Sequence, residues 1–259
     1  TDALYRDAGY ELGAPAGVTL ADAVKTWAGL PLAFQPGTAW CYSVSTDVLG
    51  RLVEVLSGQS LDVFLAERIL GPLGMVDTAF GLAEDQRSRL AALHVPDPAS
   101  RKAVRFDELA PVSRTVPSFL SGGGGLVSTA DDYLRFCDFL LRQGERNGVR
   151  LLSPRTVDYM TRNHLPGGSD LAGYARSMFA ETAYAGVGFG LGFSVVVDPA
   201  ANKVLTSPGT FSWGGAASTG FYVDPVEEVT ALFMTQLLPS STWPLRSQLT
   251  QLVSQAILA

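Results

Sequence analysis

The sequence contains few of the residues that build metal sites and disulfide frameworks. It has two histidines, His94 and His164, and two cysteines, Cys41 and Cys137, in 259 residues. The histidines lie far apart, with no Cys or Glu at zinc-ligand spacing, so we expect no metal site and a surface or structural role for both. Two cysteines cannot form several disulfides. The pattern favours two reduced thiols, as in cytosolic proteins.

Other features are also missing, and each absence excludes a class of function. The 19 Lys and Arg residues are scattered in a chain of net charge -6, so no basic stripe for nucleic acid is present. No run approaches the roughly 20 apolar residues of a membrane span, and residues 1–7 are too polar for a secretory signal. The glycines at 122–125 lack a following Gly-Lys-Ser/Thr and predict a tight turn, not a phosphate loop. We expect no cofactor, nucleic acid or membrane partner.

The remaining composition predicts a globular protein with a sizeable core, because 47% of the residues are hydrophobic and 17% are charged. Periodicity and caps predict a mainly helical region over residues 1–180, followed over 181–259 by an antiparallel sheet and a C-terminal helix. This order predicts an α+β fold in which both regions pack as one unit. Helices are expected over 20–30, 47–56, 60–70, 128–141, 153–163 and 245–257, and strands over 190–197, 204–206, 215–223 and 228–235.

Two short motifs stand out as candidates for chemistry. Tyr42-Ser43-Val44 is predicted on a loop just before the helix at 47–56, and Trp213-Gly214-Gly215 at the start of a strand. No Gly-x-Ser-x-Gly is present, which argues against the nucleophile elbow of α/β-hydrolases. Residues 81–120 are polar, with four prolines, and predict a long excursion with little regular structure.

The two motifs resemble two of the three signatures of the penicillin-recognising serine hydrolases. The resemblance is greatest to the carboxylesterases related to class C β-lactamases, known as family VIII, and it extends to residues 32–37, 69–75, 123–133 and 151–154. It implies a β-lactamase/transpeptidase-like fold, in which an antiparallel sheet is flanked by helices beside an all-helical region. It also implies that a serine attacks an ester or amide carbonyl, activated by a lysine three residues later and assisted by the tyrosine.

The resemblance assigns Tyr42 as the general base. A free tyrosine has a pKa of about 10, so a neighbouring lysine charge is needed for it to accept a proton. The alternative for Tyr42 is a buried aromatic whose hydroxyl caps a loop. In the same family the backbone N–H after the Trp213 triplet, here that of Ala216, donates to the oxyanion.

The resemblance also assigns substrate contacts to Ser43, Val44, Trp213, Gly214 and Gly215. We expect the two glycines to leave room for the acyl group, since neither has a Cβ. Trp213 stands where β-lactamases carry a lysine or histidine, and Val44 where they usually carry an asparagine. Both departures favour a small-molecule ester over a penicillin. Trp213 could alternatively be a plain core aromatic.

The nucleophile motif of this family, Ser-x-x-Lys, is absent. The only lysines are Lys25, Lys102 and Lys203, and none has a serine three positions earlier. The resemblance places the motif N-terminal to Tyr42, so we expect a missing N-terminal segment to supply it and this chain alone to be inactive. A β-lactamase, an amidase or peptidase, an acyltransferase and an inactive binding module remain alternatives on the same scaffold.

Overall fold

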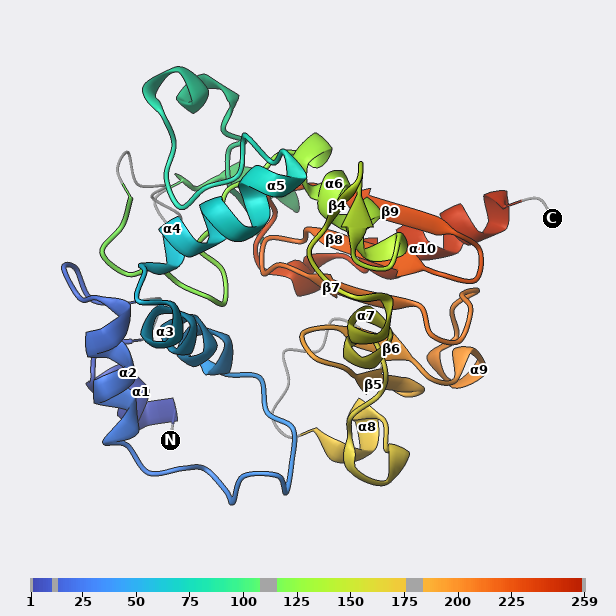
Figure 1. The fold of residues 1–259 in the computed structure, drawn as a ribbon, viewed down its shortest axis with the longest axis horizontal. Helices are drawn as coiled ribbons and strands as arrows, with labels where there is room; N and C mark the ends of the chain where they lie inside the picture. Colours follow the sequence, from blue (N-terminus) through green and yellow to red (C-terminus); the bar gives the residue numbers. More distant parts are fainter. Residues whose placement is uncertain (1, 11–13, 108–115, 176–183, 258–259) are drawn as a thin grey trace.

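Helices and a five-stranded antiparallel sheet make up the computed structural model, which describes residues 2–10, 14–107, 116–175 and 184–257 (Figure 1). Figure 1 shows α1 to α4 on one side of the molecule and the sheet on the other. The α+β arrangement is therefore as predicted. The short elements of the described chain include α1 (Asp2–Asp7), β3 (Glu145–Arg146), β4 (Val149–Arg150), a 3-10 turn (Pro166–Gly168), α8 (Leu171–Tyr174), α9 (Pro199–Asn202) and a second 3-10 turn (Ser240–Thr242).

The helices with clear capping signals form close to where the sequence predicts them. α2 (Leu20–Ala28) begins after Thr19, whose hydroxyl accepts a hydrogen bond from the Asp22 amide, and α3 (Ser45–Ser57) ends at Gly58 with a φ of 72°. α6 (Ala130–Leu141) and α7 (Pro154–Met160) are capped by Thr129 and Ser153. Local hydrogen bonds at the caps fix these boundaries without help from the rest of the fold.

The predicted helix end before Gly71 and Pro72 is wrong. The helix continues from α4 (Leu61–Leu65) through a π-helical turn (Ala66–Leu70) into α5 (Gly71–Leu73). It ends at Gly74. The Gly71 amide bonds to the Ala66 carbonyl, which is π-type spacing. This turn places Pro72 at the start of the next turn, where its missing N–H is tolerated.

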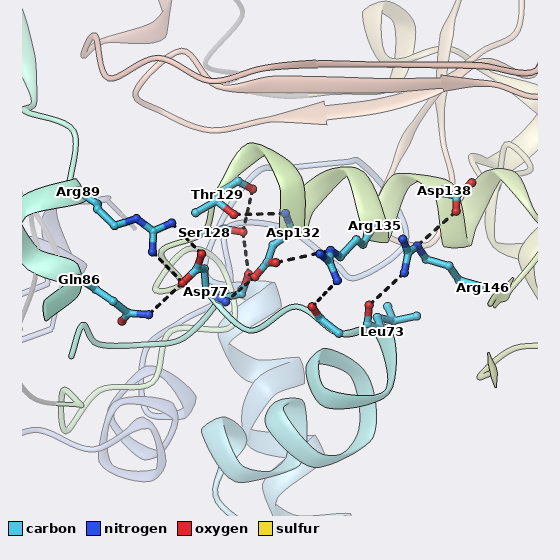
Figure 2. A network of polar contacts seen from close by, with 12 residues as sticks. Leu73, Asp77, Gln86, Arg89, Ser128, Thr129, Asp132, Arg135, Asp138 and Arg146 are labelled. Carbon is cyan, nitrogen blue, oxygen red and sulfur yellow. Dashed lines mark hydrogen bonds and ion pairs between the residues drawn. The ribbon is translucent and has the colours of Figure 1, made fainter. Parts of the chain in front are cut away.

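The polar excursion also holds more regular structure than predicted. It contains a 3-10 helix (Glu84–Arg89) and an antiparallel hairpin of β1 (His94–Asp97) and β2 (Lys102–Arg105). Figure 2 shows how it is fastened to α6: Arg89 binds both carboxylate oxygens of Asp77, and Asp132 of α6 accepts from the Asp77 amide at 2.7 Å. These polar bonds act together with apolar packing, since Leu93 and Leu120 of this segment are buried.

The sheet has the strand order β5-β6-β7-β8-β9, with every neighbouring pair antiparallel. Its strands are β5 (Val187–Phe189), β6 (Ser194–Val196), β7 (Phe211–Gly214), β8 (Gly220–Asp224) and β9 (Val229–Phe233). The antiparallel pairing of the last two predicted strands is confirmed by β8 and β9, but β5 and β7 were missed and residues 204–206 form no strand. The Trp213 triplet also lies at the end of a strand, not at its start. Residues 215–219 form the turn that leads into β8.

The main core lies between the sheet and α6. Cys137, Phe139 and Leu140 of α6 join a buried cluster that also includes Leu73 and Phe193, and therefore contains residues on both sides of position 180. Phe221 and Val223 of β8 face this cluster. Because side chains alternate along a strand, Gly220 and Tyr222 face the other side of the sheet, where α10 (Leu245–Ala256) packs on β8 and β9 (Figure 1). The predicted packing of the last helix on the sheet is confirmed.

α3 departs from the amphipathic pattern that predicts it. Its buried residues are Asp47 and Gly50, whereas Leu49 is 57% exposed and Val55 61% exposed. An apolar helix face is therefore open to solvent, with no described segment over it. Within the described ranges, no helix combines the length and hydropathy that crossing a bilayer needs.

Candidate active site

Tyr42 lies in an extended segment directly before α3. Two residues earlier, the Trp40 amide donates to the Tyr174 carbonyl at 3.1 Å and forms an isolated parallel bridge with Ala175. This bridge joins the loop to the end of α8. In an extended chain, residues two apart point the same way, so Trp40 and Tyr42 present their rings on one side. The Tyr42 side chain remains 48% exposed.

Four aromatic rings from three separate segments meet around Tyr42. The Tyr42 ring stacks on Trp213, with centroids 5.9 Å apart and 25° between the planes. Phe189 of β5 contacts the ring of Trp213 at 5.4 Å and that of Trp40 at 5.1 Å, both edge-on. The ring centroids of Trp40 and Tyr42 are 6.2 Å apart, so the four rings form one closed cluster. This aromatic ring cluster holds the proposed base against the strand that carries the Trp213 triplet.

The turn after β7 presents the Ala216 amide. The Gly215 amide donates to the Thr219 carbonyl at 3.1 Å, and the Gly215 carbonyl accepts from the Ser218 amide at 3.1 Å. A trans peptide group points its N–H opposite to its C=O, so the Ala216 N–H points away from the turn. No described residue accepts a hydrogen bond from that N–H. It is available as a donor.

Gly214 and Gly215 do not leave room for the acyl group in the way that the sequence predicted. A Cβ on Gly214 would lie 2.2 Å from the Arg246 Cζ atom, and one on Gly215 would lie 2.5 Å from the Thr219 hydroxyl. The space left by the missing side chains is therefore occupied by the protein's own Arg246 and Thr219. These glycines permit internal packing, and no room for an acyl group is gained at their Cβ positions.

A cavity of about 850 Å³ joins the two motifs. Tyr42, Trp213, Gly214, Gly215 and Ala216 all line it, whereas Ser43 and Val44 do not. Much of the remaining lining lies along the α10 side of the sheet, from residues such as Ser194, Ser212, Tyr222 and Leu249. The structure therefore brings five of the seven predicted residues together. The catalytic and substrate-binding roles of all seven remain predictions.

Asp47 fixes the position of the helix that follows Tyr42. Its side chain accepts from the Ser121 hydroxyl at 2.6 Å and from the Gly123 amide at 3.2 Å, although Asp47 is only 8% exposed. Gly122 passes so close to α3 that a Cβ there would lie 2.4 Å from the Thr46 carbonyl oxygen. The glycine run is thus a tight turn, as predicted, and it packs against the start of α3.

Sequence reasoning missed Trp40, Phe189 and Arg246. Trp40 could have been found from its spacing, since an aromatic two residues before Tyr42 in an extended segment points the same way. Phe189 and Arg246 carry no local signal, because their partners lie 24 or more positions away in sequence. Among the described residues, no three His, Cys, Asp or Glu side chains group as metal ligands would. Both cysteines are free thiols.

Comparison with known proteins shows the family to which this chain belongs. The profile of the Beta-lactamase family matches residues 2–255, and the chain belongs to this family. Esterases and acyltransferases are among its relatives.

Particular relatives cover much of the chain. Protein Rv1367c of Mycobacterium tuberculosis is 41% identical over 82% of this chain and 52% of its own length. Esterase EstB of Burkholderia gladioli is 33% identical over 82% of this chain and 53% of its own length. The structure of EstCE1, a hydrolase with promiscuous acyltransferase activity, superposes with a TM-score of 0.75 at 24% identity, covering 96% of this chain and 65% of that one, and shows the shared fold. The chain spans about half the length of these curated relatives.

Proposed function

We propose that this protein is a serine hydrolase that cleaves carboxylic esters through an acyl-enzyme. The observation that carries the proposal is the stacking of Tyr42 on Trp213, in the same cavity that the Ala216 residue lines. Tyr42 is the base that takes the proton of the attacking serine, and the Ala216 N–H stabilises the oxyanion of the tetrahedral intermediate. The aromatic ring cluster holds the phenol close to the end of β7.

The attacking serine comes from a Ser-x-x-Lys segment that this sequence does not contain. The lysine of that segment would favour the ionised form of the Tyr42 phenol. The exposed apolar face of α3, which follows directly after Tyr42, supports a packing site for such a segment. A groove of about 340 Å³ lies beside it, lined by Leu49, Val53, Phe80, Leu126 and the glycine turn. A buried amphipathic helix is the kind of element that such a groove accommodates.

An ester substrate is supported by what stands at the end of β7. Trp213 offers no positive charge for a β-lactam carboxylate, and the Arg246 guanidinium is bonded to the Thr219 and Gly215 carbonyls. The name of Esterase EstB, which is 33% identical, supports the same substrate class. The alternative from another class of function is a binding module, an inactive member of the family that has lost its serine.

The test is hydrolysis of short p-nitrophenyl esters by the full-length gene product. We expect Tyr42→Phe to lower kcat by roughly 10²- to 10⁴-fold, as loss of a general base does. Tyr159→Phe, a change at a tyrosine that is 57% exposed, is the matched control and should leave kcat unchanged. Full turnover in Tyr42→Phe would discard the proposed base, and a full-length product without any Ser-x-x-Lys would favour the binding module.

Acyl transfer is the second candidate, supported by the relative named Monacolin J acid methylbutanoyltransferase, 28% identical over 88% of this chain. An acyl-enzyme can be attacked by an alcohol or an amine as well as by water. Adding either to the ester assay separates the two functions. A hydrolase releases the free acid throughout, whereas an acyltransferase diverts most of the acyl group to the added acceptor.

A further inference from the structure

Arg246 of α10 lies against the backbone of the β7–β8 hairpin. Its Nε donates to the Thr219 carbonyl at 2.8 Å, and its Nη2 donates to the Gly215 carbonyl. The side chain passes over Gly214 and Gly220, which are cross-strand partners in the sheet. A Cβ at Gly220 would lie 3.0 Å from the Arg246 Cγ. The two glycines therefore form a flat surface on which the arginine lies.

The carbonyl that Arg246 holds belongs to the same peptide group as the Ala216 N–H. In a planar trans peptide, fixing the direction of the C=O fixes the opposite direction of the N–H. Gly215 O is held from two sides, by the Ser218 amide at 3.1 Å and by the guanidinium. The guanidinium also carries a full positive charge, and a charged donor on the C=O polarises the peptide and strengthens its N–H as a donor.

We propose that Arg246 is a positioning residue for the oxyanion site, which aims and polarises the Ala216 N–H through the Gly215 carbonyl. The inference rests on the proposed role of Ala216. Arg246 also lines the cavity, but it acts on the oxyanion through the Gly215 peptide group and from the face of the sheet opposite Trp213. Lysine cannot replace it fully, because only the planar fork of arginine can bond both carbonyls in one geometry.

The first test measures the peptide group directly, without any activity. The sequence contains only two Gly-Ala pairs, Gly13-Ala14 and Gly215-Ala216. Labelling glycine with ¹³C at the carbonyl and alanine with ¹⁵N therefore selects two amide signals in a carbonyl-filtered NMR spectrum, with Ala14 as internal reference. We expect Arg246→Met to shift the Ala216 nitrogen and proton resonances while the Ala14 signal stays in place.

A matched control separates this effect from general loss of an arginine. Arg150 also donates to two carbonyls, those of Gln143 and Leu152, but in a different part of the fold. Arg150→Met should leave the Ala216 signal unmoved. Arg246→Lys should give a smaller shift than Arg246→Met, and it keeps the test informative if the methionine variant fails to fold. An Ala216 signal that does not respond to either Arg246 variant would overturn the proposal.

The second test is kinetic and uses the full-length gene product. Because the Ala216 donor acts on the transition state, we expect Arg246→Met to lower kcat by roughly 10- to 100-fold, less than the roughly 10²–10³-fold for a lost donor, with KM nearly unchanged. Arg246→Lys should recover part of this loss. An unchanged kcat in an active enzyme also overturns the proposal. A wild-type enzyme without esterase activity overturns the proposed function instead, and the Ala216 signal then decides the present inference alone.

Discussion

The two thiols of the chain differ in how far they are buried. Cys137 lies on α6 and is fully buried, and this burial raises the pKa of its thiol to about 12. Cys41 is only partly buried, next to Tyr42. Since the thiolate is the reactive form, a reagent at pH 8 should modify Cys41 and leave Cys137 intact in the folded protein. Mass spectrometry after treatment with iodoacetamide checks this.

Two controls test the selective labelling of Cys41. Denaturation in urea should expose both thiols to the reagent, and Cys41→Ser should abolish modification of the folded chain. Rapid labelling of Cys137 under native conditions would contradict its place in the core between α6 and the sheet.

Tyr42 and Trp213 could be found from sequence because each lies in a short motif of recognisable order. The rest of the site depends on contacts between distant segments. Phe189 reaches Trp213 only because β5 pairs with β6, which in turn pairs with β7, and Arg246 reaches Gly215 only because α10 returns over the sheet. Gly214 shows the same limit, because the sequence contains no local sign of the Arg246 side chain that occupies the space of its missing Cβ.

At the scale of elements, the β8–β9 turn is organised by one buried carboxylate. Asp224 is 3% exposed and accepts from the amides of Val226, Glu227 and Ser207 and from the Thr210 hydroxyl, all within 3.1 Å. Burial alone would raise the pKa of Asp224, but the hydrogen bonds outweigh it and lower the pKa below its usual range. The ionised carboxylate of Asp224 therefore stabilises the turn.

We expect Asp224→Asn to lower the free energy of unfolding by about 2 kcal/mol at pH 7, because an amide cannot accept all four hydrogen bonds. A group whose pKa is depressed by folding contributes its stability above its unfolded pKa of about 4, and loses it as the pH falls through the folded value. The difference between the variant and the wild type should therefore shrink below about pH 4. Urea unfolding at several pH values measures it.

Glu227→Gln is the matched control, because Glu227 is an exposed acid in the same turn. It should change stability little at either pH. An Asp224→Asn penalty that stays constant from pH 7 to pH 3 would show that the loss comes from packing and not from the charge.

Helices were predicted more accurately than strands, and the reason is physical. A helix begins and ends through hydrogen bonds within a few residues, as at Thr129, Ser153 and Gly58. A strand is defined by its partner. β7 ends at Gly214 because the Gly215 carbonyl enters a turn with Ser218, a pairing that the apolar pattern of residues 215–223 does not reveal.

At the scale of the whole molecule, the polar network of Figure 2 connects the long excursion to the core helix. Asp132 is 2% exposed and accepts from the Asp77 amide at 2.7 Å and from the Thr78 hydroxyl at 2.9 Å. Arg135 and Arg146 add bonds from the α6 side to the Gly74 and Leu73 carbonyls. The Asp132 carboxylate therefore joins α6 to the segment that follows α5.

Removing that carboxylate leaves the buried Asp77 amide without its acceptor and the Thr78 hydroxyl with Ser128 as its remaining partner. We expect Asp132→Ala to lower the free energy of unfolding by about 3 kcal/mol, since each unsatisfied buried group costs roughly 1–3 kcal/mol. Asp131→Ala is the control, because Asp131 lies in the same first turn of α6 but is exposed. Chemical unfolding measures both, and equal losses in the two variants would contradict a special role for Asp132.

The α+β class followed from the sequence, whereas the exposed face of α3 did not. The apolar residues of that helix predict burial, yet Leu49 and Val55 are more than half exposed in the described structure. Periodicity shows that a helix has an apolar face. What covers that face depends on the rest of the protein.

The bonds from Arg246 to the β7–β8 hairpin also set an order of events during synthesis. A chain leaves the ribosome with its N-terminus first, so the β7–β8 hairpin emerges before α10, which carries Arg246. The turn at Ala216 can form its own hydrogen bonds among Gly215, Ser218 and Thr219 while translation continues, but it gains its bonds to Arg246 only once α10 has left the exit tunnel. The nascent chain therefore completes this part of its cleft only after α10 has been synthesised.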